Sequence, residues 1–280
     1  MAKIIPMNFY KSLETVLTAD NPSEKFEAFR AFYARYKAGE VEFEERFEPL
    51  VFTTPSYAAF CNVVPPLKVP KRKKLTTERG QVILLHAIAH IEYSAIDLAL
   101  DHAYRFHGLP KAYYDDWLEV ADDEIRHFEM LNTLLEELGA KYGDLDVHNS
   151  LFEASYKTQN LVDRMAVVPR YLEANGLDAT PQVLERLERL PSDPMLEKIK
   201  AALKIILHEE IDHVHKGDRW FNYACEKEGV SPDTFFAIIE KYSPGAFPKK
   251  NGVNIEARKE AGFSCSEMKE ILDGHECDEL

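Results

Sequence analysis

The segment Ala121-Asp-Asp-Glu-Ile-Arg-His127 contains a Glu-x-x-His motif, Glu124 to His127, and the same motif returns at Glu210-Ile-Asp-His213. In both places apolar residues recur at spacings of three and four, which is the period of one face of an α-helix. The glutamate of each motif lies in the middle of that apolar face, and the histidine lies one turn further on. Two long helices are therefore predicted to present an acidic group and an imidazole to a core.

A third acidic residue, Glu92, occupies the same kind of position on a helix expected at 77–107. The apolar face around it consists of Leu85, Ile88, Ala89, Ala95, Ile96, Ala99 and Ala103. A carboxylate that is buried without a partner is strongly destabilising, and no Lys or Arg belongs to these three apolar faces. Bound metal cations would neutralise the acidic groups, because carboxylate oxygens and neutral imidazole nitrogens are good ligands for them.

Four-helix bundles with di-iron or di-manganese sites use one Glu from each of two helices and a Glu-x-x-His motif from each of the other two. The helix expected at 149–174 must then supply the remaining carboxylate, from Glu153, Asp163 or Glu173. We choose Glu173, because each half of the chain then reads as a Glu helix followed by a Glu-x-x-His helix. Pro169 predicts a kink or local unwinding just before it. The predicted metal ligands are Glu92, Glu124, His127, Glu173, Glu210 and His213.

The rest of the chain also reads as helices, so the predicted fold class is all-α. Helices are expected at 8–19, 22–38, 77–107, 111–138, 149–174, after Pro181, at 194–228, at 231–241 and, as short segments, within 254–272. Prolines interrupt residues 40–76, which indicates a long connection. The predicted domains are N-terminal helices with this connection at 1–75, a four-helix bundle at 76–228, and a C-terminal helical cap and tail at 229–280.

The composition argues against several classes of protein. The 280 residues carry a formal net charge of −14, which disfavours nucleic-acid binding, and the basic run Lys71–Lys74 is expected to be a solvated face. No apolar run approaches the ~20 residues of a membrane helix, and the apolar stretch near the N-terminus is too short for a signal peptide. The four cysteines (Cys61, Cys225, Cys265 and Cys277) lie far apart, which predicts a reduced, cytoplasmic protein.

Other polar residues receive simpler interpretations. His86 and His90 lie on a face of their helix away from Glu92, so we expect them to hydrogen-bond to a metal ligand or between helices rather than to bind metal themselves. Asp212 or His90 could orient a ligand histidine through its second ring nitrogen. Cys225 is expected in the core, as are three tyrosines that could also be redox-active: Tyr93, Tyr156 and Tyr171.

The chain resembles the ferritin-like superfamily, whose bundle carries Glu, Glu-x-x-His, Glu and Glu-x-x-His in that order. It is most similar to a largely uncharacterised bacterial ferritin-like family, through Leu84-Leu-His-Ala-Ile-Ala-His-Ile-Glu92, Tyr114–His127, Ala166–Asp178 and Glu210–His213. The resemblance implies a ferritin-like four-helix bundle with a long crossover, N-terminal helices and a C-terminal extension. It also supports Glu173, because the family has a Glu before the same Ala-x-Gly-Leu-Asp segment.

The predicted function is that of a di-iron (or di-manganese) carboxylate oxidoreductase, an O2-dependent oxygenase or hydroxylase of an unidentified substrate. Its cofactors would be two iron ions, with manganese equally suited, and a ferredoxin or flavin reductase would supply electrons. Residues 40–76 and 243–263 are expected to cap the site, in a monomer or small homo-oligomer. The alternatives are an iron-handling or peroxide-detoxifying protein, a bundle that metal only stabilises, and a tRNA-modifying hydroxylase that binds RNA through Lys71–Lys74.

Overall fold

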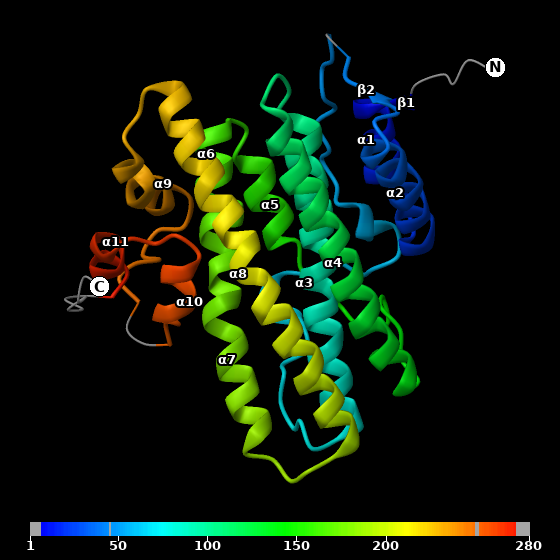
Figure 1. Cartoon of the computed structure of the whole chain (residues 1–280). Coiled ribbons are helices and arrows are strands. Elements are labelled where there is room, and N and C mark those ends of the chain that lie inside the picture. Colours follow the sequence, from blue (N-terminus) through cyan, green and yellow to red (C-terminus); the bar gives the residue numbers. More distant parts are fainter. Residues whose placement is uncertain (1–6, 45, 250–251, 273–280) are drawn as a thin grey trace. The chain divides into compact units, whose positions relative to one another are not determined.

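The computed structural model of the chain describes residues 7–44, 46–249 and 252–272, and its regular structure is almost entirely helical (Figure 1). By their contacts, the residues group into two compact units. The first comprises residues 1–71 and 86–149, and the second comprises residues 72–85 and 150–280. The prediction of an all-α fold is confirmed.

The first unit contains α1, α2, α4 and most of α3. Their bounds are Phe9–Leu17 (α1), Pro22–Lys37 (α2), Glu78–Arg105 (α3, from His86 onward in this unit) and Lys111–Glu137 (α4). The connection from α2 to α3 includes two short 3-10 turns, η1 (Ser56–Ala59) and η2 (Pro66–Lys68). A parallel pair of two-residue strands, β1 (Met7–Asn8) and β2 (Val41–Glu42), was not among the expected elements.

Side-chain caps explain where α1 and α2 begin. The Asn8 side chain accepts a hydrogen bond from the Lys11 amide at 2.8 Å, and Asn21 accepts one from the Glu24 amide at 2.9 Å. Asparagine is a preferred N-cap because its side-chain oxygen satisfies an amide that has no partner within the helix. Pro22 follows at the first helical position, where its missing N–H costs nothing.

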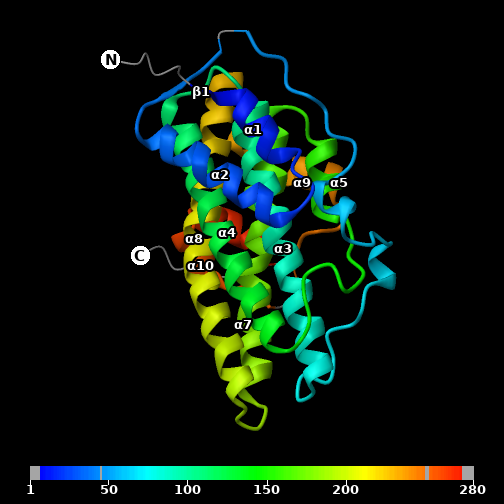
Figure 2. The same cartoon turned by 90° about the vertical axis from the view of Figure 1, so that its right-hand side faces the viewer.

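Helices α3 and α4 lie side by side in both views (Figure 1 and Figure 2) and are joined by residues 106–110. The Tyr113 hydroxyl at the start of α4 donates a hydrogen bond to the His102 carbonyl oxygen near the end of α3, at 3.1 Å. The His102 ring also packs edge-on against Trp117. These buried contacts hold the two helices as an antiparallel hairpin and fix which faces they turn toward each other.

The second unit contains the start of α3 and the helices that follow residue 149. Their bounds are Ser150–Lys157 (α5), Leu161–Val167 (α6), Val168–Glu173 (η3), Ala174–Glu188 (α7), Pro194–Glu228 (α8), Pro232–Thr234 (η4), Phe235–Tyr242 (α9), Ile255–Glu260 (α10) and Cys265–Ile271 (α11). The predicted helix 194–228 is confirmed. Asp193 caps its first turn through the Met195 and Leu196 amides, and Gly229 ends it with a φ of 68°.

The helix predicted at 149–174 is wrong in its extent, because it is interrupted after α5. The Arg164 side chain, which is fully buried, reaches back and donates hydrogen bonds to the carbonyl oxygens of Ser155 and Thr158. It thereby satisfies carbonyl groups that the end of α5 leaves open. The Asn160 side chain then caps α6.

The same prediction placed a helix stop at Asn175-Gly176, and this is also wrong. Gly176 is helical, and α7 continues through Pro181 to Glu188. Three leucines of α7 are buried (Leu177, Leu184 and Leu187), and α7 packs against α8. Tertiary packing therefore outweighs the local stop signal.

One helix, α3, is long and apolar enough to cross a membrane by length and composition, but 78% of its apolar window is buried inside the protein. Burial of this kind is typical of the core helix of a soluble protein. Cys61 and Cys225 are buried free thiols, as expected, whereas Cys265 is disulfide-bonded, so the prediction of reduced cysteines is wrong at that position. Cys277 lies outside the described residues.

Candidate metal centre

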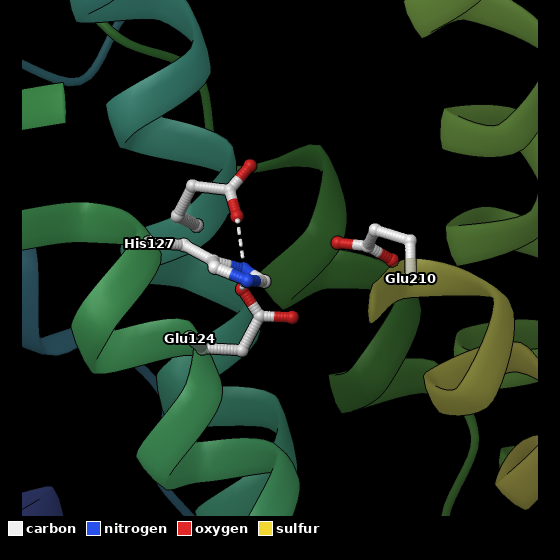
Figure 3. Close-up of side chains that lie close together, drawn as sticks. Glu124, His127 and Glu210 are labelled. Carbon is white, nitrogen blue, oxygen red and sulfur yellow. Dashed lines mark ion pairs between the residues drawn. The ribbon is translucent and has the colours of Figure 1, made fainter. Parts of the chain in front are cut away.

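The α3–α4 hairpin brings three of the predicted ligands together. Glu92 of α3 and Glu124 and His127 of α4 are all buried, and Figure 3 shows Glu124 and His127 side by side. The His127 Nδ1 atom lies 3.2 Å from Glu92 Oε2 and 3.5 Å from Glu124 Oε2. One ligand atom from each of the three residues lies within 4.8 Å of the others. A Glu/His cluster that can hold a metal ion is therefore present in the first unit.

The electrostatics of this cluster reflect two carboxylates held in a low-dielectric core. Burial, followed by the negative charge of Glu124, raises the pKa of Glu92 from 4.5 to about 8. Burial alone would lower the pKa of His127, but its hydrogen bonds to Glu124 and Glu92 and their negative charges raise it well above the usual value. The histidine thus holds its proton between the two acidic groups, at the position a cation would take.

The second unit carries the other Glu-x-x-His motif on α8. His213 is fully buried and Glu210 is 13% exposed, and the His213 Nδ1 atom lies 4.0 Å from Glu210 Oε2. Residues on the same helix face are buried on both sides of the motif: Leu203, Ile206, Val214 and Phe221. The structure therefore confirms that the motif interrupts an apolar helix face.

Glu173 ends η3, a π-helical turn that begins at Val168 and contains Pro169. The predicted unwinding at Pro169 is confirmed, and its cause is the missing proline N–H, which removes one α-helical hydrogen bond. The turn lies directly against α8, since a Cβ atom at Gly217 would come within 2.7 Å of Pro169 Cβ. Pro169 of η3 lies opposite Gly217 of α8, and the two segments run in opposite directions. Glu173 is about one turn after Pro169 and His213 is about one turn before Gly217, so Glu173 and His213 lie at the same level.

His86 and His90 hold a connecting segment of the first unit in place. The Nε2 atom of His86 accepts hydrogen bonds from the Gly143 and Leu145 amides, at 3.0 and 3.3 Å. His90 contacts the Tyr142 hydroxyl through Nδ1 at 2.8 Å and the His148 carbonyl oxygen through Nε2 at 2.7 Å. Both histidines form hydrogen bonds, as expected, but these bonds go to the connection between α4 and α5 rather than to another helix. Since both ring nitrogens of His90 are engaged in this way, it does not orient a ligand histidine.

The remaining polar candidates are placed elsewhere. Asp212 forms an ion pair with Lys216 at 2.6 Å. Of the rejected third-helix carboxylates, Glu153 is exposed beside Lys157, and Asp163 accepts a hydrogen bond from the Tyr242 hydroxyl at 2.6 Å. The basic run 71–74 is exposed, as expected. Cys225 and Tyr93 are buried, Tyr171 packs against Phe247, and Tyr156 is 46% exposed and therefore not in the core.

Sequence reasoning missed the buried charges that surround η3. Arg170 is paired with Asp218 at 2.7 Å and Glu267 at 2.6 Å, and Asp178 is paired with Arg258 at 2.7 Å and Lys249 at 2.6 Å. The partners are far apart along the chain and their residue types are common. No local pattern could therefore have identified them.

The fold and this cluster define an all-α protein with a buried Glu/His group suited to a metal ion. The chain belongs to the family described as Protein of unknown function (DUF455), which matches residues 18–269. It is also similar to a protein of Haemophilus influenzae (strain ATCC 51907 / DSM 11121 / KW20 / Rd) described as "Uncharacterized protein", with 36% identity over 277 residues, 95% of this chain and 94% of the relative. No solved structure matches the chain significantly.

Proposed function

We propose that Glu92, Glu124 and His127 combine with Glu173, Glu210 and His213 to form a dinuclear metal centre in a ferritin-like four-helix bundle. The observation that carries the proposal is the convergence of Glu92 and Glu124 on the Nδ1 atom of His127, in a buried position. Two carboxylates in a core repel each other and lose hydration. A cation at that point would reverse both effects.

The donor set fits two ions of iron or manganese. Hard carboxylate oxygens with one imidazole nitrogen per ion are typical of non-haem iron and manganese sites. Four carboxylates would balance the charge of two divalent ions. The four donor segments (α3, α4, η3 and α8) are each long or firmly packed, as a site that must hold its geometry requires.

The activity that we propose is that of a di-iron, or di-manganese, oxidoreductase that uses O2 to oxygenate or hydroxylate a substrate. The metal pair would supply the redox chemistry, with electrons delivered by a separate reductase. The chain's own contribution is to hold the ligands and to exclude water, because the apolar residues around Glu124 and His213 are buried.

The first test is metal analysis of protein purified without oxygen, followed by optical spectra when O2 is admitted. Two metal ions per chain, O2 consumption and a transient absorption band are the expected results. Metal that stabilises the protein without O2 consumption would instead indicate a purely structural site. A large cage in gel filtration would indicate iron storage, and absence of bound metal under these conditions would contradict the proposal.

Matched variants then test the ligand assignment. Glu124→Gln keeps the shape of a buried side chain but removes its charge, and Glu136→Gln makes the same change at an exposed position of the same helix. On α8, Glu210→Gln pairs with Glu226→Gln, another exposed position. We expect the first variant of each pair to lose metal and the second to retain two ions per chain.

A further inference from the structure

The C-terminal segment of the second unit is bonded to the chain on both sides of Glu173. Before Glu173, the Arg170 side chain donates to Glu267 Oε1 of α11 at 2.6 Å and to Asp218 Oδ1 of α8 at 2.7 Å. After it, the Asp178 carboxylate accepts hydrogen bonds from Arg258 of α10 and from Lys249. The π-helical turn and the start of α7 are therefore held by side chains that lie 71 to 97 residues further along the chain.

The guanidinium group of Arg170 is buried among aromatic rings and carboxylates. Its guanidinium carbon lies 5.1, 4.2 and 4.6 Å from the ring centroids of Phe221, Phe235 and Phe263, and the side chain is 2% exposed. Aromatic faces attract a guanidinium group, and the two carboxylates fix its plane by directional hydrogen bonds. The backbone of η3 at Arg170 consequently has one position.

The contacts after Glu173 are equally specific. The Arg258 Nη2 atom donates to the Ala174 carbonyl oxygen at 3.2 Å, and Lys249 Nζ donates to the Asn175 side chain at 2.5 Å. The Asn254 amide adds a third kind of donor to the Asp178 carboxylate, at 3.0 Å. Positive partners on Asp178 lower its pKa in spite of its burial. The charge on this carboxylate is thus maintained inside the protein.

We propose that Lys249, Arg258 and Glu267 form a clamp that positions Glu173, acting through Arg170 on one side and Asp178 on the other. The inference rests on the proposed metal centre. A π-helical turn is rare and occurs mostly as a single turn within an α-helix, frequently at functional sites. A ligand that is held in place by neighbouring hydrogen bonds loses metal affinity when those partners are removed. Arg170, Asp178 and Arg258 are in this view positioning residues that touch neither metal nor substrate.

The test compares Asp178→Asn with Asp163→Asn in the full-length protein. Asp163 is a matched control, because it also links a helix of the second unit to the C-terminal region, through the Tyr242 hydroxyl and Lys241. It lies in α6, just before η3, but its partners belong to α9 (Phe235–Tyr242) rather than to α10, α11 or Lys249. Mn(II) is titrated into metal-free protein, and the free ion is quantified by its paramagnetic resonance signal.

We expect Asp178→Asn to weaken binding of the ion that Glu173 would help to hold by roughly 10- to 100-fold, while Asp163→Asn binds Mn(II) like the wild type. Arg170→Met should weaken Mn(II) binding to a similar extent. Arg170→Lys should weaken it less, because lysine keeps the charge among the phenylalanine rings but not both hydrogen bonds. Hydrogen exchange at residues 168–174 should accelerate in Asp178→Asn and not in Asp163→Asn.

The outcomes separate the clamp from the metal centre. If the wild type binds two Mn(II) ions and Asp178→Asn binds them with unchanged affinity, the clamp is wrong and the proposed function stands. If both Asp variants weaken binding alike, the effect is one of general stability and the clamp is again wrong. If the wild type binds no Mn(II) or Fe(II), the proposed function fails and the clamp fails with it.

Discussion

The two groups of predicted ligands are built in different ways. In the first unit, Glu92, Glu124 and His127 project from uninterrupted α-helices that pack directly against each other. In the second unit, Glu210 and His213 project from a regular helix, but Glu173 ends a π-helical turn. The first group depends on helix packing alone, whereas the second also depends on a local irregularity and on the segments that support it.

This contrast indicates which group would respond to changes elsewhere in the chain. Helix periodicity determines where the ligands of the first unit point, and only substitutions in the hairpin core should displace them. The position of Glu173 depends in addition on Pro169, on the close approach of Gly217 and on the ion pairs of Arg170 and Asp178.

The largest expected effect is loss of metal when a central glutamate is truncated. Glu124→Ala in the first group and Glu210→Ala in the second should each abolish metal loading, because each removes a carboxylate of the proposed centre. The measurement is metal content per chain after anaerobic purification. Retention of two ions in either variant would contradict the assignment of that residue.

The next largest effect is a pH dependence of the stability of the metal-free protein, caused by Glu92 and His127 of the first unit. The pKa of Glu92 is about 8 in the folded chain, whereas the usual value for a glutamate is 4.5. Between these pH values the folded state therefore holds a proton that the unfolded state releases. Stability should therefore fall as pH rises from 4.5 to 8, by an amount of the order of a few kcal/mol. The raised pKa of His127 acts in the same direction above pH 6.5.

Glu92→Gln should make this dependence shallower, leaving the contribution of His127, whereas Glu136→Gln, an exposed change, should leave it unchanged. Urea unfolding of chelator-treated protein between pH 6.5 and 8 provides the measurement. A wild-type stability that is constant over this interval would show that Glu92 does not retain its proton.

A smaller effect tests the close approach that distinguishes the second group. A Cβ atom at Gly217 would lie 2.7 Å from Pro169 Cβ and 3.0 Å from its carbonyl carbon. Gly217→Ala should therefore destabilise the protein by about 1–2 kcal/mol, since overpacking costs about 1–3 kcal/mol and exceeds the gain of about 1 kcal/mol in helix propensity.

Gly176→Ala is the matched control, because Gly176 is also helical and a Cβ there meets no atom of the described residues within 4 Å. This change should stabilise the protein by about 0.5–1 kcal/mol. Opposite signs in urea unfolding would support the tight contact between η3 and α8, and equal signs would contradict it.

The smallest effect is expected for His86→Ala. Metal loading should be retained, because His86 accepts hydrogen bonds from the Gly143 and Leu145 amides rather than contacting the ligands. Those two amides should exchange faster with solvent. A loss of metal equal to that of Glu124→Ala would mean that the helix faces have been assigned incorrectly.

The parts of the structure that the sequence predicted are those set by local rules. Helix α8 was predicted to its end residues because Pro194 and Gly229 mark them. Glu92, Glu124 and His127 were grouped because periodicity determines which side chains share a face. The break after α5 depends on the reach of the buried Arg164 side chain, and the continuation of α7 depends on packing against α8. Contacts between distant residues leave no local signal, and for the same reason the ion pairs of Arg170 and Asp178 were not foreseen.

The two hydrogen bonds of His90 have a practical consequence for preparing metal-free protein. Nε2 donates to the His148 carbonyl oxygen, and in the neutral ring Nδ1 then accepts from the Tyr142 hydroxyl. Burial lowers the pKa of His90 to about 4. Acid stripping below that value would protonate Nδ1, which could then no longer accept the hydrogen bond of the Tyr142 hydroxyl, whereas dialysis against a chelator near neutrality would leave this hydrogen bond intact.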